Sequence, residues 1–337
     1  MTDTSEPILD IRNLTVRFGK VAAVNDMSLT LRRGETLGLV GESGSGKSTT
    51  SRAVLQINRP TSGEVWFDGE ELVSASRTRL KALRQRMQMV FQDPRSSLDP
   101  RMTVEALLAE PLVIFGIGNR TLRRAKVAEM LRLVGLDPAV GSRYPHEFSG
   151  GQAQRIAIAR ALILEPELII ADEPVSALDV SIQAQIINLL VKLRTQLNLS
   201  MLFIAHDLAV VRHISDRVAV MYMGRVVELA DRDRLYGAPA HPYTRALLSA
   251  VPVPDPAVEV HRKREILTGE LPSPGRLPYG CAFRSRCPLH AALGRPEVCA
   301  NVLPPLVPLA PNQSAACHFV SDASAAAARD QRGGVSA

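Results

Sequence analysis

A short glycine-rich stretch carries the most recognisable chemistry in this sequence. Residues 41–48 read Gly-Glu-Ser-Gly-Ser-Gly-Lys-Ser, which fits the pattern G-x-x-x-x-G-K-[ST]. Backbone N–H groups in such a loop converge on phosphate oxygens, the Lys47 ammonium neutralises the β- and γ-phosphates, and the Ser48 hydroxyl binds Mg²⁺. A chance glycine turn is the alternative, but a strand at 36–40 and a helix at 47–57 are predicted on either side. We therefore expect a nucleotide site formed by Gly41, Ser43, Gly44, Ser45, Gly46, Lys47, Ser48 and Thr49.

Two adjacent acidic residues end a second apolar stretch, Leu-Ile-Ile-Ala-Asp-Glu at 168–173. The carboxyl end of a buried strand is where α/β sheets bind ligands. Asp172 is placed to hold Mg²⁺ together with Ser48, and Glu173 is placed to polarise the water that attacks the γ-phosphate. The alternative, an exposed acidic loop, is disfavoured by the phosphate loop upstream.

A third motif, Phe148-Ser-Gly-Gly-Gln152, opens a predicted helix at 151–164. A serine and two glycines at a helix N-terminus present N–H groups and a hydroxyl, which can dock on a nucleotide held by another subunit. An ordinary N-cap is the simpler interpretation of this string alone. The motif resembles the LSGGQ signature of ABC ATPases, and Gln154-Arg-Ile-Ala-Ile-Ala-Arg160 continues the resemblance. The expected anion-binding residues are Ser149, Gly150, Gly151 and Gln152.

Two further positions match this family at the ends of predicted strands. Gln92 follows the strand at 87–91 and corresponds to the Q-loop, and His206 follows the strand at 201–205 and corresponds to the switch histidine. Each has an ordinary explanation taken alone, as a turn glutamine or a hydrogen-bonded histidine. The resemblance makes Gln92 a Mg²⁺ and γ-phosphate sensor, and it makes Glu173, His206 and Gln92 the catalytic group.

The same resemblance covers the D-loop and the adenine-stacking position. The stretch Ser176-Ala-Leu-Asp179 corresponds to the D-loop, although Asp179 could simply cap a helix. Phe18 corresponds to the aromatic residue that stacks on adenine, although it could equally be a core side chain. The family more often has Tyr at that position, and Leu in place of Phe148. The ordered spacing of these motifs over residues 10–230 favours the family over the separate explanations.

The resemblance implies a head-to-tail dimer with ATP and Mg²⁺ held between the loop of Lys47 and the partner's loop at 149–152. The second ATPase subunit is an identical or a related chain, and closure of the dimer is relayed to membrane permease subunits through a helical insertion.

The order of predicted elements indicates an α/β fold, and the resemblance implies a P-loop NTPase of the ABC nucleotide-binding type. We expect a nucleotide-binding domain at 7–250, with an antiparallel β subdomain at its N-terminus and a helical subdomain at about 93–165. A small C-terminal extension follows at 251–320, and 321–337 has the composition of a disordered tail.

All four cysteines lie in this extension, at 281, 287, 299 and 317. Four thiolates in a segment with little apolar content suggest a metal that replaces a core, and the spacing leaves zinc and an iron–sulfur cluster open. Unligated thiols are the alternative. His241-Pro-Tyr-Thr-Arg and the cysteine pattern resemble the extension of oligopeptide, dipeptide and nickel importers. That resemblance favours a [4Fe–4S] cluster over Zn²⁺ at Cys281, Cys287, Cys299 and Cys317.

Composition excludes little, because the formal net charge of +6 suits nucleic acid, nucleotides or an anionic membrane equally. A nucleic-acid ATPase is disfavoured because Ser149 lies only 57 positions after Gln92, too close for a long coiled coil between them. An exporter would more often be fused to membrane helices, and a scaffold that binds nucleotide without hydrolysis would not need Glu173. No apolar run approaches the roughly 20 residues of a membrane helix, and the acidic N-terminus has no signal-peptide pattern.

The resemblance thus implies a peptide-importer ATPase that is peripheral on the cytoplasmic face of a bacterial inner membrane. An external solute-binding protein would be an indirect partner, and the chain would bind no nucleic acid. The sequence does not identify the solute.

Overall fold

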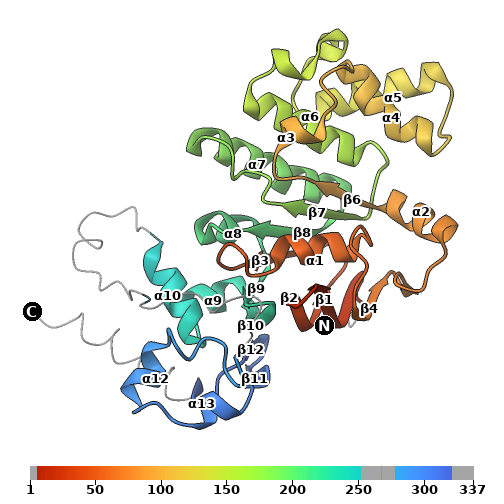
Figure 1. Cartoon of the computed structure of the whole chain (residues 1–337). Coiled ribbons are helices and arrows are strands. Elements are labelled where there is room, and N and C mark those ends of the chain that lie inside the picture. The colour runs from red at the N-terminus through yellow and green to blue at the C-terminus, as the bar shows by residue number, and fades with distance from the viewer. Residues whose placement is uncertain (1–5, 252–266, 268–277, 321–337) are drawn as a thin grey trace, which may run out of the picture.

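The computed structural model describes residues 6–251, 267 and 278–320. Within these residues the strands form a four-stranded antiparallel sheet, ordered β2-β1-β4-β5, and an eight-stranded sheet, ordered β11-β12-β10-β9-β3-β8-β7-β6 (Figure 1). The smaller sheet consists of β1 (Leu9–Phe18), β2 (Val21–Leu31), β4 (Ser62–Phe67) and β5 (Glu70–Glu71). It is the antiparallel β subdomain predicted at the N-terminus.

The larger sheet is parallel at its centre, where β9, β3, β8, β7 and β6 run side by side. Its strands are β3 (Thr36–Val40), β6 (Met87–Val90), β7 (Leu168–Asp172), β8 (Ser200–Ala205), β9 (Arg217–Tyr222), β10 (Arg225–Asp231), β11 (Val307–Ala310) and β12 (Gln313–Ala315). Every residue of β3, β7, β8 and β9 is buried, which explains their near-continuous apolar sequences.

Alternate side chains of the central strands belong to two different cores. Ile169 and Ala171 of β7 pack in the core shared with the helical layer, whereas Leu168 and Ile170 pack in the core shared with the N-terminal sheet. This is the two-residue period of a strand that is covered on both faces. The buried sheet therefore brings the carboxyl ends of β3, β7 and β8 to one edge, where the site described below lies.

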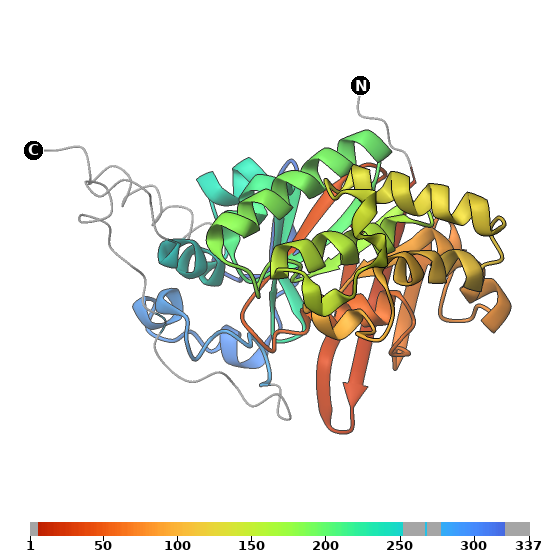
Figure 2. The same cartoon turned by 90° about the horizontal axis from the view of Figure 1, so that it is seen from above.

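Four helices and two 3₁₀ turns are inserted between β6 and β7 and form a layer at one end of the described structure (Figures 1 and 2). Side-chain oxygens of Thr103, Asn119 and Ser149 cap three of the helices by accepting backbone N–H bonds. The layer consists of α3 (Pro94–Ser97), α4 (Val104–Ile114), α5 (Arg120–Leu133), η1 (Pro138–Ser142), η2 (Pro145–Glu147) and α6 (Gly150–Leu162). The predicted helical insertion is confirmed.

The remaining helices pack around the parallel sheet or follow it. They are α1 (Lys47–Val54), α2 (Arg77–Arg86), α7 (Val180–Leu197), α8 (Leu208–Ile214), α9 (Arg232–Gly237), α10 (Pro242–Ala250), α12 (Pro288–Ala292) and α13 (Val298–Asn301). The sequence patterns did not predict α2 or α8. In α2 only Leu80 and Leu83 are buried, so its apolar face is too narrow to stand out among the arginines.

The C-terminal segment joins the main sheet instead of forming a separate layer. Strand β12 pairs with β10, and β11 pairs with β12, so both strands extend the eight-stranded sheet at its edge. Both views place this segment at the opposite end of the molecule from the helical layer (Figures 1 and 2). The predicted tail at 321–337 lies outside the described residues. Among the helices that are described, none has the length and apolar character required to cross a membrane.

Candidate active site

The predicted phosphate loop connects β3 to α1 and depends on two glycines with positive φ. Gly41 has φ +155° and Gly46 has φ +106°. A Cβ atom on Gly46 would lie 2.2 Å from the carbonyl oxygen of Ala23, and one on Gly41 would lie 2.2 Å from that of Met221. Both the backbone conformation and the neighbouring carbonyls therefore require glycine at these positions.

The loop contains hydrogen-bonding groups that have no partner among the described residues. Gly46 is the N-cap of α1 and provides no side-chain cap, so the first-turn N–H groups are available to an anion. The Ser45 hydroxyl is buried without a hydrogen-bond partner in the described structure. Ser43 and Gly44 are exposed at the tip, and Thr49 is half-buried in the first turn of the helix. A cradle with an unsatisfied buried hydroxyl and free helix-end donors fits nucleotide phosphates.

Lys47 is buried within this loop. Its Nζ donates to the carbonyl oxygens of Gly41 at 2.8 Å and Glu42 at 3.0 Å. Burial lowers the pKa of Lys47 from its ordinary value, and the charges of Glu173 and Asp172 oppose this change. A phosphate group would supply the full counter-charge that the carbonyl oxygens do not.

A pair of oxygen ligands suitable for Mg²⁺ lies between α1 and β7. The Ser48 hydroxyl donates to Asp172 Oδ1 at 2.9 Å, and the Ser51 hydroxyl lies 3.3 Å from Asp172 Oδ2. Burial raises the pKa of Asp172, while the two serine hydroxyls act in the opposite direction. Ser48 and Asp172 are oxygen donors of the type that Mg²⁺ prefers. Sequence reasoning missed Ser51, which lies one helical turn after Ser48 on the same face of α1.

Two side chains converge on one oxygen of Glu173. Gln92 Nε2 donates to Glu173 Oε2 at 2.9 Å, and His206 Nδ1 lies 3.4 Å from the same oxygen. Glu173 itself has φ +47°, an uncommon conformation for a residue other than glycine, and its N–H donates to the carbonyl oxygen of Ile204. The backbone after β7 therefore turns so that Glu173 meets residues that follow β6 and β8.

The structure brings together six of the predicted residues: Lys47, Ser48, Gln92, Asp172, Glu173 and His206. Gly41, Ser45 and Gly46 form the loop around Lys47, and several of the other predicted residues are exposed. Phe18 is 53% exposed at the end of β1, and Asp179 is exposed before α7 without capping it through its side chain. Ser149 and Gln152 are exposed and bond to each other in a capping box. Figure 1 shows α6, which these two residues open, separated from α1 by β6, β7 and β8.

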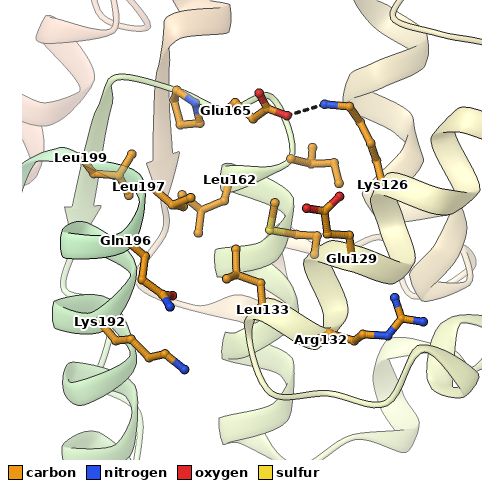
Figure 3. A pocket seen from close by; sticks show the side chains of 13 residues that line it. Lys126, Glu129, Arg132, Leu133, Leu162, Glu165, Lys192, Gln196, Leu197 and Leu199 are labelled. Carbon is orange, nitrogen blue, oxygen red and sulfur yellow. Dashed lines mark hydrogen bonds and ion pairs between the residues drawn. The ribbon is translucent and has the colours of Figure 1, made fainter.

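A cavity of about 740 Å³ lies apart from these residues, between α5, α6 and α7 (Figure 3). Leu133, Leu162 and Leu197 form part of its lining, and Lys126 pairs with Glu165 at its edge. None of the predicted site residues lines it. Its size alone does not make it a catalytic site.

The four cysteines gather around one small cavity of about 20 Å³, which His241, His290 and His318 also line. Burial, together with the three other cysteines, raises the pKa of Cys281 to about 12. Among the described residues, however, no three His, Cys, Asp or Glu side chains are arranged so that they could hold a metal ion. The four thiols predicted as metal ligands nevertheless all line this one cavity.

Comparisons with known proteins agree with this geometry. Residues 24–176 match the family model described as ABC transporter, and residues 227–292 match that of the oligopeptide/dipeptide transporter C-terminal region. The chain is 50% identical over 328 residues to the oligopeptide transport ATP-binding protein AppF of Bacillus subtilis, covering 94% of this chain and 98% of that protein. It is also 50% identical to a putative peptide import ATP-binding protein of Brucella ovis, covering 94% of this chain and 98% of that protein.

Solved structures with the same fold include the ABC transporter component cbiO1 of Clostridium perfringens, with a TM-score of 0.64 and 29% identity over 69% of this chain and 92% of that one. Another is a dimeric ATP-binding cassette, MJ0796, in a post-hydrolysis state with ADP and Pi. It has a TM-score of 0.61 and 30% identity over 66% and 98% of the two chains. The chain therefore belongs to the ATP-binding subunits of ABC transporters of the oligopeptide import type, and it is an ATPase.

Proposed function

We propose that Glu173 is the catalytic base of ATP hydrolysis, oriented by Gln92 and His206. The observation that supports this most directly is the convergence of both side chains on Glu173 Oε2. A carboxylate held in one direction can accept the proton of a water molecule in line with the γ-phosphate.

The neighbouring residues would bind and orient the nucleotide. Lys47 and the first-turn N–H groups of α1 would hold the β- and γ-phosphates, and Ser48, Asp172 and Gln92 would hold Mg²⁺. Mg²⁺ held by these residues would neutralise negative charge that develops on the phosphate groups. Ser45 would donate its unsatisfied hydroxyl to a phosphate oxygen.

The test compares Glu173→Gln with the unaltered chain in Mg²⁺-dependent ATP hydrolysis, with the complete transporter in membranes. The amide keeps the size and the hydrogen bond to Gln92 but cannot accept a proton, so turnover should fall at least about 100-fold while ATP still binds. Glu165→Gln is the matched control, because Glu165 also has positive φ (+54°) but lies on the surface in an ion pair with Lys126. Retention of more than about a tenth of the turnover in Glu173→Gln would exclude the assigned role.

We also propose that the nucleotide-binding site is completed by a second ATPase subunit, which is an identical or a related chain. This is supported by the exposure of Ser149 and Gln152 at the start of α6, which β6, β7 and β8 separate from α1 of the same chain (Figure 1). Phe18 would stack on adenine, and the partner's loop at 149–152 would contact the γ-phosphate. The dimeric state of the MJ0796 cassette supports the same arrangement.

Contact with membrane permease subunits is proposed at a cleft of about 370 Å³ between the end of α1, β6 and the helical layer. Three large apolar side chains that line it, Ile57, Phe91 and Ile114, are exposed. Phe91 directly precedes Gln92, so a partner seated here would act on the catalytic group. The names of the relatives support import of oligopeptides or dipeptides, at the cytoplasmic face of a bacterial inner membrane and with an external solute-binding protein.

A [4Fe–4S] cluster at the four cysteines, or Zn²⁺ in its place, stays a proposal. It is supported by the soft thiol donors around one cavity. Visible absorbance and metal analysis of the purified chain test it, with Cys287→Ser as the variant. Equal metal content and absorbance in both proteins would exclude it.

A further inference from the structure

An ion pair joins the cysteine segment, residues 278–320, to the phosphate loop at 41–48. Arg286 Nη1 lies 2.9 Å from Glu42 Oε2 and 3.1 Å from Oε1. The two residues are 244 positions apart in the sequence, and their side chains are 10% and 23% exposed. Because water is largely excluded, this pair is screened much less than one on the surface.

Glu42 is also bound through its backbone to the residues that bind phosphate. Its carbonyl oxygen accepts from Lys47 Nζ at 3.0 Å and from the N–H of Ser45 at 3.1 Å. Its N–H donates to the hydroxyl of Tyr243 in α10 at 2.9 Å. A shift of Glu42 would therefore move the acceptor that holds the Lys47 ammonium.

Arg286 is held on the other side by an aromatic cluster. The rings of Tyr222, Tyr243 and Phe283 lie 4.7 to 5.4 Å apart, centroid to centroid. Phe283 is 1% exposed, and its carbonyl oxygen accepts from the N–H of Arg286 at 3.0 Å. Phe283 and Arg286 both belong to the short loop between Cys281 and Cys287. The position of Arg286 is thus determined by the packing of this loop on β9 and α10.

We propose that Arg286 is a positioning residue for the nucleotide site, through which the cysteine segment and the phosphate loop are coupled. The proposal rests on nucleotide binding by the Lys47 loop. The segment would hold Glu42, and Glu42 would hold Lys47 where it meets the β- and γ-phosphates. Coupling between two sites is reciprocal, so bound nucleotide must in turn stabilise the loop at 281–287.

The first test measures ATP affinity and the separate values of kcat and KM. Arg286→Ala should weaken ATP binding roughly ten-fold and raise KM with little change in kcat, because it affects ground-state positioning and not the Glu173 group. Arg286→Lys should restore most of the affinity. Glu42→Gln combined with Arg286→Ala should be no worse than either single change. Arg284→Ala is the matched control, since Arg284 bonds to backbone carbonyl oxygens within its own segment.

The second test follows amide hydrogen exchange in the whole chain, with and without Mg²⁺ and a non-hydrolysable ATP analogue. The analogue should slow exchange at 281–287 roughly ten-fold in the unaltered chain and in Arg284→Ala, but not in Arg286→Ala. Unaltered ATP affinity in Arg286→Ala, or protection at 281–287 that persists in it, would overturn the proposal. Absence of nucleotide binding in the unaltered chain would instead refute the proposed nucleotide site itself.

Discussion

The phosphate loop and the cysteine segment touch each other through Glu42 and Arg286, but different kinds of interaction determine their structures. The loop is held by its backbone: glycines at positive φ, carbonyl oxygens around Lys47, and an uncapped helix end. Within the cysteine segment, the loop at 281–287 is held by side chains from distant parts of the chain, above all Phe283 against Tyr222 and Tyr243.

This difference predicts different sensitivities. The phosphate loop, whose backbone determines its structure, should tolerate different side chains at its tip but not an added Cβ where carbonyl oxygens approach. The cysteine segment, which depends on side-chain packing, should be sensitive to truncation of buried side chains and to protonation of buried groups. The following substitutions either separate the two regions or show that they behave alike.

The largest effect is expected from Phe283→Ala. Truncating this fully buried ring leaves a cavity between β9 and α10 and should lower the free energy of unfolding by about 4 kcal/mol. Chemical denaturation measures the change. Phe18→Ala is the control, because that ring is 53% exposed and its loss should cost less than about 0.5 kcal/mol. An equal loss of unfolding free energy in the two variants would show that Phe283 does not anchor the segment.

Gly46→Ala should have the next largest effect, and it should act on nucleotide binding. The new Cβ would displace the loop from Ala23 and move Lys47, weakening ATP affinity about 100-fold, or about 2.7 kcal/mol. Equilibrium binding of a fluorescent ATP analogue measures it. Gly44 also has positive φ (+77°), but a Cβ there meets no atom within 4 Å. Gly44→Ala should therefore weaken ATP affinity at most about ten-fold. If the two variants bind ATP equally well, steric contact does not determine the loop.

The smallest effect is a pH dependence in the region around the cysteine segment. Burial lowers the pKa of His241 to about 3, and its Nδ1 accepts from the N–H of Tyr243, which requires the neutral ring. The unfolded chain takes up a proton below about pH 6.5 and the folded chain does not, so stability falls as the pH decreases. At pH 5 the loss from this group is about 2 kcal/mol.

His241→Asn isolates this contribution, because asparagine retains a capping oxygen but does not titrate. The comparison is needed since burial raises the pKa of Glu228, which contributes with the opposite sign. Thermal unfolding between pH 7 and pH 5 should show a smaller decrease for His241→Asn than for the unaltered chain. Parallel decreases would mean that His241 is protonated in the folded chain.

Local elements were predictable because their signals lie in consecutive residues. The strand at 36–40 has the predicted bounds, α6 starts within one residue of its expected position, and the hairpin of β9 and β10 turns at Met223 and Gly224 as expected. Helix α2 and the first half of β2 escaped prediction because neither has a regular apolar period.

The sequence by itself determined the order of motifs and the phosphate loop, because their signals lie in consecutive residues. It singled out Asp172 and Glu173 by their place after an apolar strand, and Gln92 and His206 by the family resemblance. Only the tertiary structure decided that Gln92 and His206 meet at one oxygen of Glu173, that Ser51 reaches Asp172, and that Arg286 holds Glu42. These contacts join side chains from separate elements, and their geometry depends on how the sheet and its covering layers pack. That packing cannot be predicted from any local pattern of residue types.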